Sequence, residues 1–86
     1  EELYQGFWVQ DCAAAAENML TEAVHLGLGA VWLGVYPKER IIKQVNSILE
    51  IPEKVKVLSL ISLGYPAEEK EASDRYIEDK VHFDKW

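Results

Sequence analysis

The sequence contains few of the residues on which enzyme and metal sites usually depend. Of its 86 residues, one is a cysteine and two are histidines. A single cysteine permits no internal disulfide, and no Cys/His cluster has the spacing of a metal site. No serine, cysteine or aspartate pairs recognisably with either histidine, so a hydrolytic triad has no support. We therefore expect neither catalytic side chains nor metal ligands.

Positive charge and long apolar runs are also scarce. Nine lysines and arginines stand against fifteen acidic residues, and the formal net charge is −6. No basic stripe could displace counterions from a nucleic acid, so nucleic acid is not an expected partner. The longest apolar candidate, Val57 to Leu63, is far too short to cross a bilayer, and nothing resembles a signal peptide. A cytoplasmic protein with no membrane association is expected.

What the sequence has is apolar residues, which make up 49% of the chain. This content is typical of a globular domain rather than of a disordered chain. A chain of 86 residues forms one domain at most, and it buries only about 60% of its unfolded surface. The lone Cys12 lies in an alanine-rich run and is expected to be a small buried packing residue.

The first half of the chain predicts a helix and a strand. Apolar residues recur at helical spacing from about 9 to 26, and Ala13 to Ala16 have high helix propensity. Gly27 and Gly29 are expected to end this helix through positive φ angles, with His25 placed favourably for the helix dipole. A short β-rich strand follows at about 30–35. Gly34 interrupts it, which indicates either a bulge or a close approach by a ligand.

The next segment predicts a second helix and a second strand. One clean apolar face extends over about 38–50, with Pro37 suited to the helix start and Pro52 stopping it. The nearly continuous apolar run at about 55–63 predicts a strand that is covered on both faces. Two helices and one short strand can hardly supply that cover, so the chain lacks partners for its own apolar surface.

The segment 67–86 is acidic, yet it is interleaved with aromatic residues. A purely disordered tail would contain few aromatics. This tail is expected to be extended and to lie along a surface, anchored by its rings.

The glycines at 27 and 29 do not form a dinucleotide-binding loop. That fingerprint needs a strand, then glycines, then a helix, whereas here a helix precedes the glycines and a strand follows them. The position of the third glycine is also occupied by Trp32.

Several runs together resemble the C-terminal half of the FMN-dependent nitroreductase family. Trp8 to Asn18 is similar to the helix that opens the second half of small members, and Gly27 to Pro37 resembles the family's most recognisable run. The turn segments and the C-terminal residues that follow are also similar to those of the family: Ile51-Pro52-Glu53, Leu63-Gly64-Tyr65-Pro66, Asp74-Arg75-Tyr76, Val81-His82 and Lys85-Trp86. Each run is weak alone, but their order and spacing are specific, and they span nearly the whole of residues 1–86.

The resemblance implies an α+β fold: two helices and two strands, with an extended tail that reaches over a partner subunit. It implies a homodimer, or an intertwined oligomer, with FMN bound at each interface. Members use NAD(P)H to reduce the flavin, which then reduces nitroaromatics, quinones or similar small-molecule acceptors. Other flavin chemistry, such as reductive dehalogenation or dehydrogenation of heterocycles, stays open. The flavin carries the chemistry, which agrees with the absence of a recognisable catalytic side chain.

The resemblance also implies specific cofactor contacts. Trp32, Leu33 and Gly34 are expected beside the flavin ring, with a backbone N–H near Gly34 donating toward flavin N5. Arg75 corresponds to a phosphate-binding arginine, a role that suits its bidentate donor geometry. Relatives often have a lysine two residues earlier, where this chain has Ser73, so phosphate binding is expected either to be weaker or to use Lys70 or Lys80. The structural alternative for Arg75 is a surface ion pair with its acidic neighbours.

The family's N-terminal FMN-binding segment has no counterpart in this sequence. The chain alone is therefore expected to bind FMN poorly or not at all. A second hypothesis follows from the same gap: the chain is a non-catalytic fragment or dimerisation unit without flavin, which assembles through its apolar surface.

Overall fold

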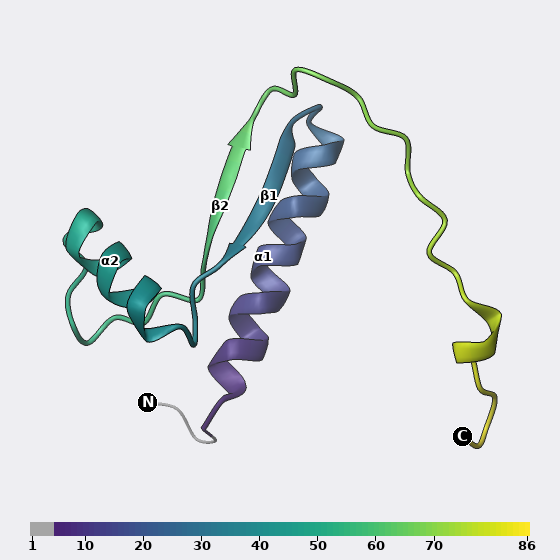
Figure 1. Ribbon diagram of the computed structural model, residues 1–86, viewed down its shortest axis with the longest axis horizontal. Coiled ribbons are helices and arrows are strands. Elements are labelled where there is room, and N and C mark those ends of the chain that lie inside the picture. Colours follow the sequence, from purple (N-terminus) through teal and green to yellow (C-terminus); the bar gives the residue numbers. More distant parts are fainter. Residues whose placement is uncertain (1–4) are drawn as a thin grey trace.

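The computed structural model describes residues 5–86 and consists of two helices, a two-stranded antiparallel sheet and a long tail (Figure 1). Helix α1 spans Phe7–His25, strand β1 Gly29–Gly34, helix α2 Glu39–Leu49 and strand β2 Ser59–Gly64. A single 3₁₀ turn follows at Glu78–Lys80. The α+β class expected from the sequence is confirmed.

Helix α1 ends in a Schellman motif. The N–H of Leu28 donates to the carbonyl of Ala23 at 2.8 Å, and the N–H of Gly27 donates to the carbonyl of Val24 at 3.0 Å. Gly27 has a φ of 75°, the left-handed conformation that glycine adopts at lowest cost. Gly29 was expected to share this role but instead opens β1, because the two bonds through Gly27 and Leu28 already complete the cap. His25 is the last helical residue, as expected.

The sheet joins β1 and β2 in register from the pair Gly29 and Gly64 to the pair Gly34 and Ser59. Strand β2 is shorter than the run at 55–63 suggested, because its pairing with β1 ends just beyond Gly34. At that end the carbonyl of Leu58 accepts both the N–H of Val35 at 3.2 Å and the N–H of Tyr36 at 3.0 Å. The ladder therefore closes before residues 55–58 can join it.

The two helices are placed differently with respect to the sheet. Helix α1 packs on the sheet, whereas α2 contacts neither strand nor α1 and is held at the side by the connecting segments (Figure 1). Pro37 does not open α2, because the preceding turn places Lys38 at the N-cap. The helix ends at Leu49 with Glu50 at a φ of 53°, two residues before Pro52.

The hydrophobic core is small. Among the described residues the buried apolar side chains are Ala16, Ala23, Val35 and Val45. Cys12, expected to be buried, is exposed, because nothing in the described chain covers that stretch of α1. The chain exposes 8243 Å², against about 5,200 Å² for a compact monomer of this size. Its radius of gyration is 17.0 Å, against about 12 Å for a compact domain.

The tail leaves the end of β2 and runs away from the body (Figure 1). All its residues from Tyr65 to Trp86 are exposed. The expected anchoring by rings does not occur on the chain's own surface, because the helix–sheet body offers no face along the tail's course. The ring contact found in the tail is local: His82 stacks on Trp86 with centroids 4.4 Å apart.

Candidate functional site

The three residues expected beside a flavin ring form the second half of β1. Trp32 is half-buried, whereas Leu33 is 47% exposed and Gly34 is also open to solvent. Immediately beyond them, Tyr36 meets the ring of Trp8 edge-on at 4.8 Å, and the Nζ of Lys56 lies 5.5 Å from the centroid of the same ring. This cluster fixes the end of β1 against the first turn of α1.

The strand is regular at Gly34, with open space beside the backbone and no bulge. It pairs regularly with Ser59, so a bulge does not explain the glycine. The next residue, Val35, donates its N–H to Leu58 on the β2 side. Because antiparallel pairs alternate between bonded and non-bonded, the N–H of Gly34 points to the opposite, free edge of β1. A Cβ built on Gly34 meets nothing within 4 Å, so packing inside this chain does not require the glycine.

Arg75 is exposed on the tail and belongs to a short turn. Its Nε donates to the Oγ of Ser73 at 3.2 Å, and the N–H of Tyr76 donates to the Oδ1 of Asp74 at 3.0 Å. Over residues 5–86 the ion pair found joins Lys70 to Glu68 at 3.6 Å, and Arg75 enters none. The guanidinium therefore keeps most of its donors for another partner.

The chain does not bring Arg75 next to Gly34. In the antiparallel register, Gly34 lies at one end of the sheet, and the tail departs from Gly64 at the other end. Beyond that point the tail stays clear of the helix–sheet body (Figure 1). The two expected cofactor contacts are thus both accessible, but they are separate in the isolated chain.

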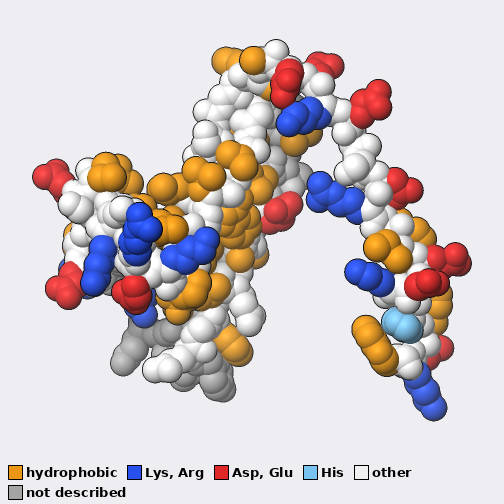
Figure 2. Space-filling model, in the orientation of Figure 1, with side chains coloured by type: hydrophobic (Ala, Val, Ile, Leu, Met, Phe, Trp, Pro, Cys, Tyr) orange, Lys and Arg blue, Asp and Glu red, His pale blue; other side chains and the backbone are white. Residues whose placement is uncertain are grey.

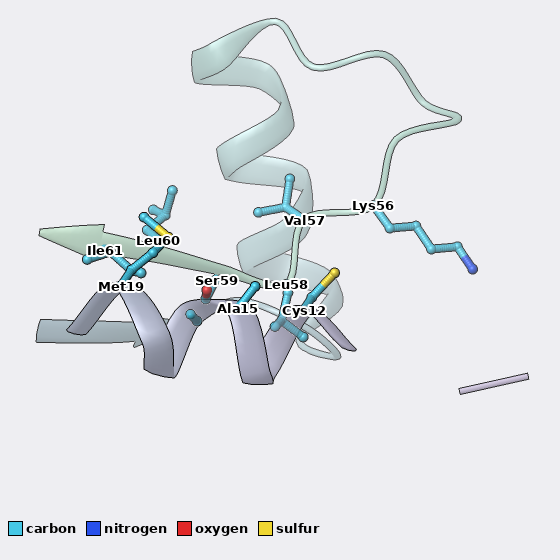
Figure 3. A pocket seen from close by; sticks show the side chains of 10 residues that line it. Cys12, Ala15, Met19, Lys56, Val57, Leu58, Ser59, Leu60 and Ile61 are labelled. Atoms are coloured by element: carbon cyan, nitrogen blue, oxygen red, sulfur yellow. The ribbon is translucent and has the colours of Figure 1, made fainter. Parts of the chain in front are cut away.

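A feature that the sequence did not identify is an apolar hollow between α1 and β2 (Figure 3). Cys12, Ala15 and Met19 line it from α1, and residues 56–61 line it from the other side, around a volume of about 520 Å³. A second hollow of about 370 Å³ continues it toward Leu26 and Leu63. The signal was present in the α1 pattern, because apolar residues recur at helical spacing along the helix while few of them are buried.

Among the described residues, neither a metal cluster nor a membrane-spanning helix is found. In residues 5–86 no group of three or more His, Cys, Asp or Glu could hold a metal ion. No helix of this part of the chain is long and apolar enough to span a membrane. The candidate site suggested by the sequence is an open backbone edge beside Trp32 and Gly34, together with the exposed guanidinium of Arg75. A planar, phosphate-bearing cofactor suits such groups, since it needs backbone donors for its ring and a cation for its phosphate.

Comparison with known proteins identifies the family of this chain. The model of the nitroreductase family matches residues 5–65. This chain belongs to the nitroreductase family. A relative from Archaeoglobus fulgidus, named as an NADH dehydrogenase/NAD(P)H nitroreductase, is 54% identical over 82 residues, which cover 92% of this chain and 47% of the relative. The nitroreductase family suggested by the sequence motifs is thereby confirmed.

Solved structures show that the fold is shared. A protein from Clostridium acetobutylicum that is named as an NADH oxidase is 40% identical with a TM-score of 0.90, covering 99% of this chain and 52% of its own. An FMN-dependent nitroreductase from Clostridium difficile is 32% identical with a TM-score of 0.84, covering 93% of this chain and 50% of its own. This nitroreductase-family chain thus spans about half the length of the relatives that it matches.

Proposed function

We propose that this chain is the C-terminal half of an FMN-dependent NAD(P)H oxidoreductase that reduces nitroaromatics, quinones or similar acceptors. Membership of the nitroreductase family supports the flavin oxidoreductase class. The names of two relatives, one an NAD(P)H nitroreductase and one an FMN-dependent nitroreductase, support the donor and the cofactor. The observation that carries the proposal for this chain is the free backbone edge at Gly34.

The residues of β1 fit the ring of FMN. Gly34 has no neighbour within 4 Å of its Cβ position, so a flat ring can approach the strand closely. Its N–H points away from β2 and can donate to the N5 edge of the ring, while Trp32 and Leu33 supply apolar surface beside it. When bound, the flavin supplies the hydride chemistry. The chain supplies position and a backbone donor.

Arg75 fits the phosphate of the same cofactor. Its single bond to Ser73 leaves two NH₂ groups for bidentate contact with phosphate oxygens. Lys70 already pairs with Glu68, which makes Arg75 the better candidate of the two. For Arg75 and Gly34 to reach one cofactor, the tail has to fold back when the complete protein assembles.

We further propose that the complete protein is a homodimer or an intertwined oligomer in the cytoplasm. The uncovered apolar surface supports assembly, and the tail has the length and the exposed rings to lie on a partner subunit. The cytoplasm supplies NAD(P)H and keeps the lone thiol of Cys12 reduced.

The second candidate is a non-catalytic fragment or dimerisation unit without flavin. The observation that favours it is the same excess of exposed surface, because a chain with this much apolar area associates whether or not a cofactor binds.

One experiment separates the two functions. A chimera is made in which this chain replaces the matching 82 residues of the Archaeoglobus fulgidus relative. We expect the chimera to be yellow with bound FMN, to oxidise NAD(P)H in the presence of a quinone and to have the mass of a dimer. We expect the 86-residue chain alone to be colourless and to retain no added FMN. A folded chimera that takes up no flavin would contradict the flavoenzyme hypothesis. It would favour the second hypothesis, a non-catalytic dimerisation unit.

A further inference from the structure

The backbone directly beyond Gly34 is held firmly. The N–H groups of Val35 and Tyr36 both donate to the carbonyl of Leu58, at 3.2 and 3.0 Å. Val35 is only 1% exposed, the most deeply buried of the described apolar side chains. Two successive donors on one carbonyl interrupt the alternation of the ladder, as in a β-bulge, and they do so after the regular pair of Gly34 and Ser59. Tyr36 is therefore free to turn its ring out of the strand and toward α1.

Two other parts of the chain meet Tyr36 there and form the Trp8–Tyr36–Lys56 cluster. The ring of Tyr36 meets that of Trp8 edge-on, with centroids 4.8 Å apart and planes at 72°. Trp8 belongs to the first turn of α1 and is half-buried. The Nζ of Lys56, from the segment before β2, lies 5.5 Å from the centroid of the Trp8 ring. Edge-on aromatic pairs and cation–π contacts each favour one relative geometry, so the cluster holds Tyr36 in a defined place.

Gly34, by contrast, has little support of its own. A Cβ built on it meets no atom beyond its chain neighbours within 4 Å, and within the described chain β1 has a strand on one edge only. Leu33, the residue before it, is 47% exposed. The place of the Gly34 N–H therefore depends on the ladder with β2 and on the cluster two residues further on. Because a group that contacts a cofactor must be held within about 0.5 Å of its productive place, the cluster has a direct bearing on this donor.

We propose that Trp8 is a positioning residue for the flavin contact at Gly34. By holding the ring of Tyr36, it sets where the N–H of Gly34 lies and how it is directed, while Lys56 holds the indole from its face. Trp8 acts through Tyr36 and needs no contact with the flavin itself. The inference rests on the proposed function, because it concerns the same backbone edge. It goes further in making cofactor binding depend on a side chain of α1, a helix that supplies none of the expected cofactor contacts.

The test uses the chimera defined above, with paired changes of the two rings. Trp8→Leu and Tyr36→Leu each remove the edge-on contact, whereas Trp8→Phe and Tyr36→Phe keep an aromatic ring at the same place. We expect each leucine variant to raise the dissociation constant of FMN about tenfold, the effect of losing one hydrogen bond. The visible absorbance of the bound flavin should shift in the same two variants. Both phenylalanine variants should keep the affinity and the spectrum of the unchanged chimera.

Ala23→Gly, at the other end of α1, is the stability control. Ala23 is 3% exposed, and glycine destabilises a helix interior. We expect this change to lower the thermal midpoint, as the leucine changes do, but to leave the FMN affinity and the flavin spectrum as they are.

Two results would overturn the inference while the proposed function stands. One is a pair of leucine variants that bind FMN with unchanged affinity and spectrum at a lowered thermal midpoint, which would make Trp8 a packing residue only. The other is an equal loss of affinity in Ala23→Gly, which would make general stability the cause. A chimera that takes up no FMN even without these changes would instead overturn the proposed function, and this inference with it.

Discussion

At the scale of single residues, Gly34 and Arg75 differ in what the sequence could reveal about them. The glycine stood out because it interrupts an apolar strand, but its two explanations, a bulge or a ligand, were separable only by the register. Regular pairing with Ser59 excludes the bulge. For Arg75, the sequence left a surface ion pair with acidic neighbours open. The bond to Ser73 shows that the guanidinium instead takes the neighbouring hydroxyl.

The role of Arg75 is testable by its removal. Arg75→Ala in the chimera should weaken FMN binding by about ten- to a hundredfold, because a hydrogen bond to a charged group contributes about 1.5–3 kcal/mol. The measurement is an FMN titration followed by flavin fluorescence. Lys85→Ala removes a cation from the same tail and should change the affinity less than twofold. Unchanged affinity in Arg75→Ala would transfer the phosphate contact to Lys70 or Lys80.

At the scale of secondary-structure elements, periodicity located both helices and both strands, but it could not set their ends. The end of α1 depends on which of two glycines takes the left-handed conformation, and composition treats Gly27 and Gly29 alike. The start of β2 depends on how far β1 extends, which is information held in another part of the chain. The sequence also could not predict that α2 lies beside the sheet rather than on it, because its amphipathic pattern indicates only that one face is covered.

The conformation of Gly27 at the end of α1 predicts how substitutions there change stability. Gly27→Ala in the chimera should lower the free energy of unfolding by about 1 kcal/mol, because alanine is strained at a positive φ. Gly27→Asn should lose less, since asparagine tolerates that conformation better. Chemical denaturation followed by circular dichroism measures both. A loss in Gly27→Asn as large as in Gly27→Ala would mean that the cap conformation is not the cause.

At the scale of the whole molecule, the sequence predicted the shortage of internal cover but not its location. A strand as apolar as β2 beside so few elements indicated missing partners, and the large exposed area agrees with that. Hydrophobic side chains are exposed on the helix–sheet body and, mixed with charged ones, along the tail (Figure 2). Only the structure shows that apolar hollows lie between α1 and β2, and that Cys12 lines one of them.

In this arrangement the chain has both proposed cofactor contacts but does not bring them into one site. The backbone edge at Gly34 and the guanidinium of Arg75 are both available, yet the register and the course of the tail keep them at separate places. Under the proposed function, completion of the fold has to bring them together. The central claim is therefore that Gly34 faces the flavin ring once the fold is complete.

The most direct test of that claim compares two matched glycine changes in the chimera. Gly34→Val and Gly64→Val place the same β-branched side chain at opposite ends of the sheet, and within this chain neither Cβ meets an atom within 4 Å. We expect Gly34→Val to weaken FMN binding at least tenfold at an unchanged thermal midpoint, and Gly64→Val to change it less than twofold. Wild-type FMN affinity in the Gly34→Val chimera would contradict the account.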